Sequence, residues 1–275
     1  MAISDISLTS GMRSNLVSLQ GTVDLLNRTQ ERLATGKRVN SPLDNATNYF
    51  VAKSHMDRAS DLSVRKDGMG EAIQTVKAAN EGIKAITDLI ASAKGIAQSA
   101  LSAGTAERSV LAAQYDQILT QIDQLASDSG YKGTNLLDSG DLTVQFNEDG
   151  SNSLTISGFD ASTATTGLGI DAAVGNWADV SDISGTGGAI ADLDAALNTL
   201  RAQAKNLSSN LNIITTRSTF TQGMINVLTE GSTNLTAADT NEEGANMLML
   251  QVRQSLGTTA LSLSAQAAQS VLRLF

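Results

Sequence analysis

Residues 190–228 read IADLDAALNTLRAQAKNLSSNLNIITTRSTFTQGMINVL, and one face of this stretch recurs with alternating steps of three and four residues. Its positions are Ile190, Leu193, Leu197, Leu200, Ala204, Leu207, Leu211, Ile214, Ser218, Thr221, Ile225 and Leu228. This period predicts a single helix of about 60 Å, at ~1.5 Å per residue. Because a helix of that length is typical of coiled coils and bundles, the stretch predicts a mainly α fold of long antiparallel helices in a rod-like coiled-coil bundle.

A tract near the N-terminus follows the same spacing. Its apolar positions are Met12, Leu16, Leu19, Val23, Leu26 and Leu33, with Gln30 as one polar interruption. We expect this helix to end near Thr35 and Gly36, because glycine readily takes the left-handed conformation that caps a helix. The loop that follows contains Pro42, the only proline of the chain.

Two further helical tracts precede the middle of the chain. The first carries Met69, Ile73, Val76, Asn80, Ile83, Ile86 and Ile90 on one face. The second begins after Gly104 and carries Leu111, Tyr115, Ile118, Ile122 and Leu125. Because only a short segment separates the two tracts, they are predicted to form an antiparallel pair.

After an expected break at residues 231–239, a last stripe runs to the end of the sequence with a mean period near that of an α-helix. Its members are Ala245, Leu248, Val252, Leu256, Ala260, Leu263, Ala267, Val271 and Leu274. A leucine stripe at a chain end must be buried against a partner or stay unfolded, so it favours self-assembly. Small residues such as Gly257 and Ser264 would let neighbouring helices approach closely.

The middle of the chain changes character. Residues 142–146 and 153–157 alternate with period two around the segment Asn147, Glu148, Asp149 and Gly150, which predicts a small β-hairpin. Residues 160–188 are rich in Gly, Ala, Ser and Thr and have little periodicity. They are interpreted as a short variable insert at the surface, a small outer domain that contains Trp177.

Composition excludes several classes of function. There is no cysteine and only one histidine, His55, so a transition-metal centre is not expected, and no cofactor is predicted. The N-terminus lacks the basic and apolar regions of a secretory signal, and no stretch reaches the ~20 apolar residues of a membrane span. The net charge is −9, and residues 133–200 contain ten acids but no Lys or Arg. An acidic middle argues against nucleic acid and fits a solvated outer surface.

Several segments together resemble bacterial flagellins. Residues 31–41 read ERLATGKRVNS and are followed by Asp44, Asn45 and Ala46, which is similar to the family's Glu-Arg-Leu-Ser-Ser-Gly-x-Arg-Ile-Asn-Ser signature. Residues 81–83, residues 131–137 and the tract from Leu256 to Leu272 resemble further flagellin segments. The ending Leu272, Arg273, Leu274, Phe275 is similar to the short alphaproteobacterial form.

The resemblance implies a folding plan for the whole chain. Residues 1–42 and 236–275 would be the two halves of an inner coiled-coil core domain. Residues 43–140 and 189–235 would be the two halves of a helical rod domain, and residues 141–188 would be the hairpin and a short surface-exposed insert. The assembly seams would be formed by Met12, Leu16, Leu19, Val23, Leu26, Leu33, Leu197, Leu200, Leu207, Leu211, Ile214, Leu248, Val252, Leu256, Leu263, Val271 and Leu274.

The resemblance also implies the function. The chain would be a non-enzymatic structural subunit that polymerises into the extracellular flagellar filament and serves swimming motility. Its partners would be other flagellin subunits, a cytoplasmic export chaperone, hook-associated junction proteins and the filament cap, with no nucleic acid and no membrane insertion. Export would use the flagellar secretion apparatus without a cleaved signal peptide.

Other interpretations of the residues stay open. The stripes could form the core of a soluble monomeric bundle, and the same terminal helices occur in the flagellin-like hook-filament junction protein. An enzyme on a helical scaffold would need a site, with His55 as a candidate general base. The acids could bind calcium, but they lack the spacing of a calcium loop. Ser and Thr of residues 151–188 are candidates for O-glycosylation.

Overall fold

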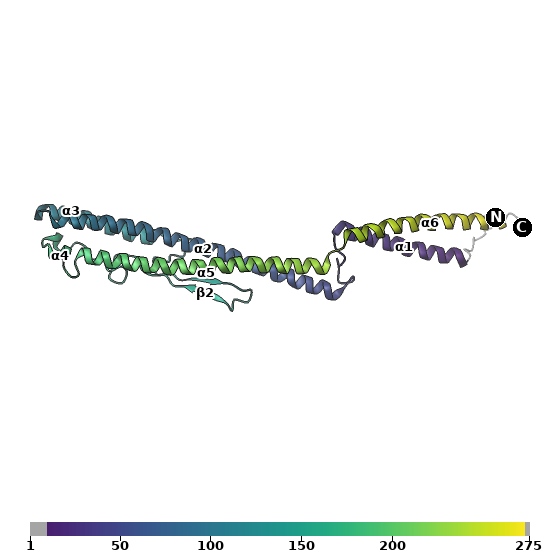
Figure 1. The fold of residues 1–275 in the computed structure, drawn as a ribbon, viewed down its shortest axis with the longest axis horizontal. Helices are drawn as coiled ribbons and strands as arrows, with labels where there is room; N and C mark the ends of the chain where they lie inside the picture. The colour runs from purple at the N-terminus through teal and green to yellow at the C-terminus, as the bar shows by residue number, and fades with distance from the viewer. Residues whose placement is uncertain (1–9, 273–275) are drawn as a thin grey trace, which may run out of the picture. The chain divides into compact units, whose positions relative to one another are not determined.

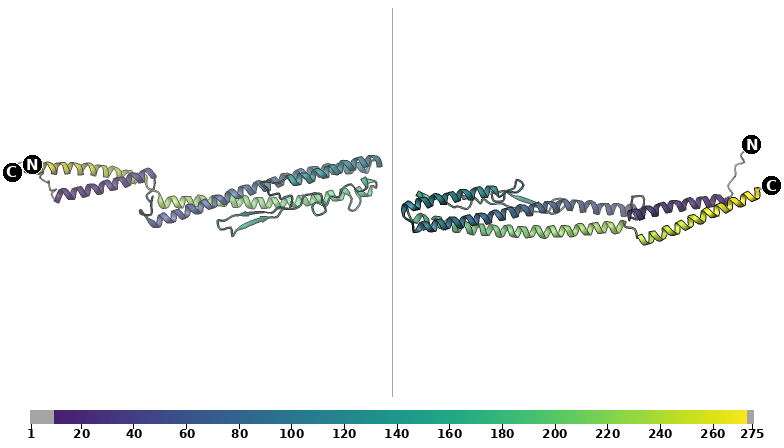
Figure 2. Two further views of the ribbon diagram at one scale, coloured as in Figure 1. Left: turned by 180° about the vertical axis from the view of Figure 1, so that it is seen from behind. Right: turned by 90° about the horizontal axis from the view of Figure 1, so that it is seen from above.

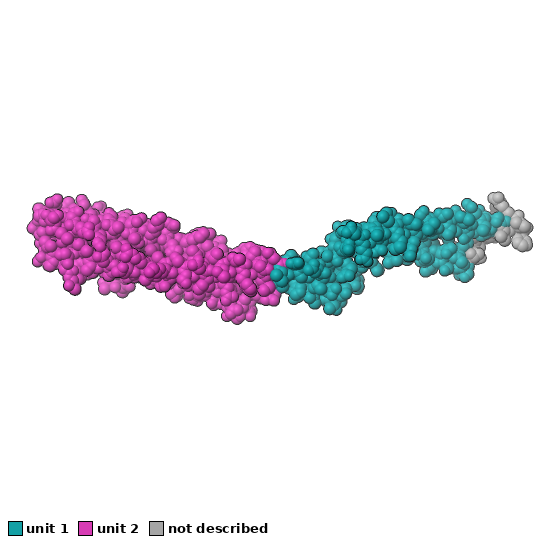
Figure 3. Space-filling model, viewed as in Figure 1, with its two compact units in different colours: residues 1–57, 227–275 teal, residues 58–226 magenta. Residues whose placement is uncertain are grey.

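The computed structural model describes residues 10–272, and long helices dominate the fold (Figure 1). The predicted class, mainly α with one small hairpin, is confirmed. The chain divides into two compact units, shown in Figure 3. Unit 1 comprises residues 1–57 and 227–275, and unit 2 comprises residues 58–226.

Unit 2 is built on residues 58–101 of α2 (Ala46–Leu101), on α3 (Thr105–Asp128) and on residues 189–226 of α5 (Ala189–Thr236). Helices α2 and α3 are joined by residues 102–104 and run in opposite directions, as predicted. The stripe of residues 190–228 is confirmed as one face of α5. Within unit 2 its buried apolar members are seven residues apart: Leu193, Leu200, Leu207 and Ile214. They share a single apolar core with the inner faces of α2 and α3.

The break expected at residues 231–239 is wrong in extent. Helix α5 continues through Gly231 to Thr236, and only residues 237–239 separate it from α6 (Thr240–Leu272). A glycine inside a helix costs about 0.5–1 kcal/mol relative to alanine, which tertiary packing can offset. Here the packing is specific, because the buried Ser232 donates a hydrogen bond of 3.0 Å to the carbonyl of Ala52.

The predicted hairpin is confirmed. Strands β1 (Leu142–Gln145) and β2 (Ser153–Ile156) pair antiparallel, with Leu142 opposite Ile156 and Thr143 opposite Thr155 (Figure 2). Val144 and Ile156 point into the core of unit 2. The next residue along the chain from β1, Phe146, lies under the guanidinium of Arg217, 5.2 Å from its ring centroid.

The insert differs from the expected small outer domain, because Trp177 is fully buried in the core of unit 2. The segment includes the short helices η1 (Val174–Trp177) and α4 (Ser181–Ser184). Side chains of α3 hold its backbone: Asp123 accepts from the N–H of Thr163, and Asp116 accepts from the N–H of Ala173. These long-range hydrogen bonds leave no period in the sequence, which is why the pattern predicted a variable insert at the surface.

Candidate functional site

The two terminal helices of unit 1, α1 (Ser10–Thr35) and α6, pack along one another. Two contacts fix their direction. A Cβ atom on Gly257 would lie 2.9 Å from Cδ1 of Leu19, and Arg32 forms an ion pair with Glu243. Later residues of α1 therefore meet earlier residues of α6, so the pair is antiparallel.

The face of α1 that meets α6 carries the predicted N-terminal stripe. Met12 and Leu26 are buried, and Leu16, Leu19, Val23 and Leu33 are half-buried. The expected place of Gln30 in this seam is wrong, since its side chain is exposed and Thr29 is buried instead. Steps of three and four lead from Leu26 to Leu33 through Thr29, and steps of four and three through Gln30, so the spacing alone could not distinguish the two positions.

Helix α6 presents two different faces. The face toward α1, here called the inner α6 face, is buried or half-buried and again alternates steps of four and three. It consists of Glu243, Met247, Leu250, Gln254, Gly257, Leu261, Ser264 and Ala268. The apolar pattern of the sequence did not reveal this face because five of its eight members are polar or small, although their regular spacing was a signal that could have found it.

The stripe predicted from the sequence lies on the other side of α6. Its large members are exposed in the single chain: Leu248 at 66%, Val252 at 59%, Leu256 at 65% and Leu263 at 64%. These four residues are here called the outer α6 face. The predicted members Val271 and Leu274 cannot be added to it, because the side chain of Val271 and all of Leu274 lie outside the described part of the chain.

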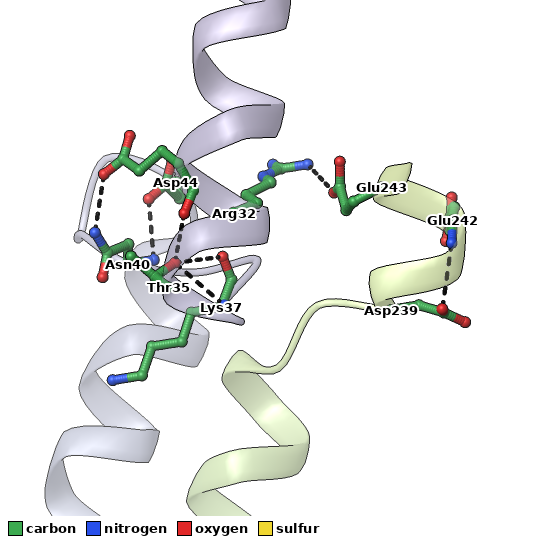
Figure 4. Close-up of polar contacts among 9 residues, drawn as sticks. Arg32, Thr35, Lys37, Asn40, Asp44, Asp239, Glu242 and Glu243 are labelled. Atoms are coloured by element: carbon green, nitrogen blue, oxygen red, sulfur yellow. Dashed lines mark hydrogen bonds and ion pairs between the residues drawn. The ribbon is translucent and has the colours of Figure 1, made fainter. Parts of the chain in front are cut away.

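A polar cluster lies at the junction of the α1/α6 pair, where α1 ends and α6 begins (Figure 4). Arg32 donates a hydrogen bond of 2.9 Å to a carboxylate oxygen of Glu243, whose side chain is only 9% exposed. Beside it, Asp44 accepts from the backbone N–H groups of Ser41 and Asn40, and these bonds lower the pKa of Asp44. The Glu-Arg and Asn-Ser residues of the sequence signature therefore act in capping and pairing at this junction.

Backbone hydrogen bonds connect the two segments that cross here. The N–H of Arg38 donates to the carbonyl of Thr236 over 2.7 Å, and the N–H of Ala238 donates to the carbonyl of Gly36 over 3.0 Å. Gly36 has φ 68°, the left-handed conformation expected for a helix cap. Both segments leave their helices in fixed directions, which positions the start of α6 beside the end of α1.

The remaining candidate residues are placed elsewhere. Leu197, Leu200, Leu207, Leu211 and Ile214 belong to the core of unit 2. His55 is half-buried in unit 1, beside Gly231.

Residues 10–272 contain no group of three His, Cys, Asp or Glu side chains that could hold a metal ion. In the same range, no helix is both long and apolar enough to cross a bilayer. The acids of the insert have local roles. Asp160 and Asp179, for example, accept hydrogen bonds from Ser162 and Ser181, which lower the pKa of both carboxyl groups.

The chain is similar to known proteins over its whole length. Residues 3–141 match the family model described as the bacterial flagellin N-terminal helical region. Flagellin FljK of Caulobacter vibrioides is 30% identical over 279 residues, covering 100% of both chains. A flagellin of Brucella melitensis is 29% identical over 281 residues, covering 99% of each. The crystal structure of Bacillus cereus flagellin aligns with a TM-score of 0.47 at 17% identity, covering 56% of this chain and 88% of that one.

Proposed function

The chain belongs to the bacterial flagellin family, and on that premise we propose that the outer α6 face is the surface by which its copies bind one another in the filament. Flagellins are structural subunits that assemble with other flagellin subunits into the extracellular flagellar filament. The chain is such a subunit, and its relatives across the full length are themselves flagellins rather than junction proteins. The family is structural, and we infer a structural rather than an enzymatic role for this chain.

One observation carries the proposal: Leu248, Val252, Leu256 and Leu263 are each about three-fifths exposed or more in the single chain. Large apolar side chains gathered along one helix face mark an interaction surface. Full burial of such a side chain stabilises by roughly 1.5–3 kcal/mol. Four of them per subunit, repeated along a polymer, would favour association of the subunits.

Packing within the chain and contact between subunits fall to different apolar residues. Leu16, Leu19 and Leu26 face α6 inside the chain and hold the α1/α6 pair. Leu256 and Leu263 face away from α1 and are left for a neighbouring subunit. Val17 and Leu25 are exposed on the side of α1 away from α6 and would offer a second apolar surface to neighbouring subunits.

Family membership supports further parts of the plan. We infer that residues 1–42 and 236–275 form the inner core of the filament, and that residues 43–140 and 189–235 form the surrounding rod. The hairpin and insert of residues 141–188 would lie outermost. Before export through the flagellar apparatus, a chaperone would cover the outer α6 face, since that face is apolar and unpaired in the single chain. Junction proteins and the filament cap would contact the ends of the polymer.

The test is to place a charge on the outer α6 face. We expect Leu263→Asp to yield a secreted, soluble monomer that does not polymerise, because a carboxylate cannot be buried between subunits without a partner. Ser262→Asp is the matched control, an exposed polar position next to Leu263 that should still polymerise. Electron microscopy under polymerising conditions gives the readout. Normal filaments from Leu263→Asp would refute the proposed surface.

A further inference from the structure

Helix α6 turns its less apolar face toward α1. Counting roughly 100° per residue, the inner and outer faces lie about half a turn apart on the helix. The inner α6 face combines Met247, Leu250 and Leu261 with the polar or small residues Glu243, Gln254, Gly257, Ser264 and Ala268, whereas the outer face is made of leucines and a valine. Hydrophobic burial alone would favour the reverse arrangement, with the outer face on α1. Specific contacts must therefore determine which face meets α1.

The Arg32–Glu243 ion pair is the contact with the greatest effect on this choice. Glu243 is buried at the seam, and a buried carboxylate is tolerated only when it is paired. Arg32 also depends on the pair, because its Nε atom is buried and has no hydrogen-bond partner within residues 10–272. Turning α6 by half a turn would carry Glu243 away and bring Ala245 opposite Arg32, with Leu248 about one turn further along, so the guanidinium would lose its carboxylate partner.

The start of α6 holds Glu243 in place. Asp239 caps the helix by accepting from the N–H groups of Asn241 and Glu242 at 2.8 and 3.2 Å. The carbonyl of Asp239 accepts from the N–H of Glu243 at 2.9 Å. The first turn is thus fixed relative to the junction, so its orientation is passed along the helix. Further along, Leu19 fits over Gly257, where no side chain intervenes.

We propose that the Arg32–Glu243 ion pair determines which face of α6 packs on α1, and so keeps the outer α6 face free for other subunits. The inference rests on the proposed function, because it explains how the intersubunit surface stays unoccupied within the chain. Arg32 and Glu243 are positioning residues in this account. They act through the packing of α6 on α1.

Disulfide trapping can measure the orientation, since the natural sequence has no cysteine. One reporter is the full chain with Leu19→Cys and Gly257→Cys, two positions that face each other in the observed orientation of α6. The other carries Leu19→Cys and Thr259→Cys. Thr259 lies on the exposed side of α6, so this disulfide reports the turned orientation. Oxidised under polymerising conditions, the first reporter should cross-link within one chain far more than the second.

Glu243→Arg should lower the ratio of the two cross-linking yields by about tenfold or more, because it leaves two like charges at the seam. The exchange Arg32→Glu with Glu243→Arg should restore the ratio. Glu243→Gln, which keeps the shape without the charge, should shift the ratio in the same direction by less. Glu242→Arg is the matched control, one residue away and exposed, and should leave the ratio unchanged.

The outcomes separate this inference from the proposed function. An unchanged ratio in Glu243→Arg and Glu243→Gln, even with less total cross-linking, would mean that the pair only adds stability, and the inference would be overturned. A fallen ratio that the exchanged pair does not restore would also overturn it. Neither result affects the Leu263→Asp test. That test addresses the outer face whichever contact orients the helix.

Discussion

The indole ring of Trp177 packs against the ring of Tyr115, with their centroids 4.9 Å apart and both side chains fully buried. The backbone adopts an unusual conformation to reach this position. Gly175, Asn176 and Trp177 have φ values of 56°, 53° and 55°, a left-handed run that costs roughly 1–2 kcal/mol for each residue other than glycine. Surrounding contacts must offset that strain.

Arg108 makes the main polar contacts that offset the backbone strain at Trp177. Its guanidinium donates to the carbonyls of Trp177 and Ala178, each at 2.9 Å, and to the carbonyl of Ala103 at 3.1 Å. We expect Arg108→Ala to destabilise unit 2 by ~2–4 kcal/mol and to loosen the insert, since bonds from a charged donor are among the stronger ones. Because Trp177 is the only tryptophan, a red shift of its fluorescence reports the loosening. A buried emission spectrum retained in Arg108→Ala would contradict this role.

Gly82 lies where two segments approach closely. A Cβ atom there would be 2.3 Å from Oγ of Ser129 and 2.6 Å from Cδ1 of Leu137. Gly82→Ala should therefore lower stability by about 1–3 kcal/mol through overpacking. Gly95 is the control in the same helix, because a Cβ atom there meets nothing within 4 Å. Gly95→Ala should raise stability by about 0.5–1 kcal/mol. Thermal unfolding compares the two, and equal shifts would show that Gly82 is not a packing position.

Substitutions at Gly257 test how closely helices α1 and α6 pack. Only the end of the flexible Leu19 side chain lies close to it, so Gly257→Ala should be nearly neutral, the gain in helix propensity offsetting a small shift. Gly257→Leu should separate the helices, at a cost of about 1–3 kcal/mol, and reduce filament yield. Sedimentation of polymer measures the yield. Full yield from Gly257→Leu would argue that the two helices do not pack this closely in the filament.

Two carboxylates should affect stability with opposite dependence on pH. Burial raises the pKa of Asp192, and the nearby charge of Asp171 raises it further. The charged form of Asp192 therefore opposes folding once the pH exceeds that raised pKa. Asp192→Asn should therefore raise the melting temperature at about pH 7 and have less effect at about pH 3. Hydrogen bonds from Ser162 lower the pKa of Asp160.

The Asp160 carboxylate thus stabilises above its unfolded pKa of about 3.9, and that stability is lost as the pH falls through the folded pKa. Asp160→Asn should lower the melting temperature at about pH 7, and the difference should shrink toward about pH 3. Melting curves of both variants across this range make the comparison. Shifts of the same sign at neutral pH would contradict the assignment.

Local patterns in the sequence predicted much of the fold. The alternating steps along residues 190–228 predicted helix α5, because a helix buried on one side repeats its apolar residues every turn. Residues 142–157 predicted the hairpin from alternation and a turn signal. The pattern could not place Trp177, since what holds it is a set of side-chain bonds from α3, far away in the sequence.

The amino-acid sequence by itself therefore determined the long helical tracts, the place of the hairpin turn, and the leucine stripe of the last helix, which needs to be buried. These properties follow from residue spacing within one segment. Only the tertiary structure decided that α5 continues through Gly231 and that Leu256 and Leu263 face away from α1. Helix α6 is apolar enough on two sides to pack with either, so its period cannot specify an orientation. That choice depends on contacts such as Arg32 with Glu243, between residues at opposite ends of the chain.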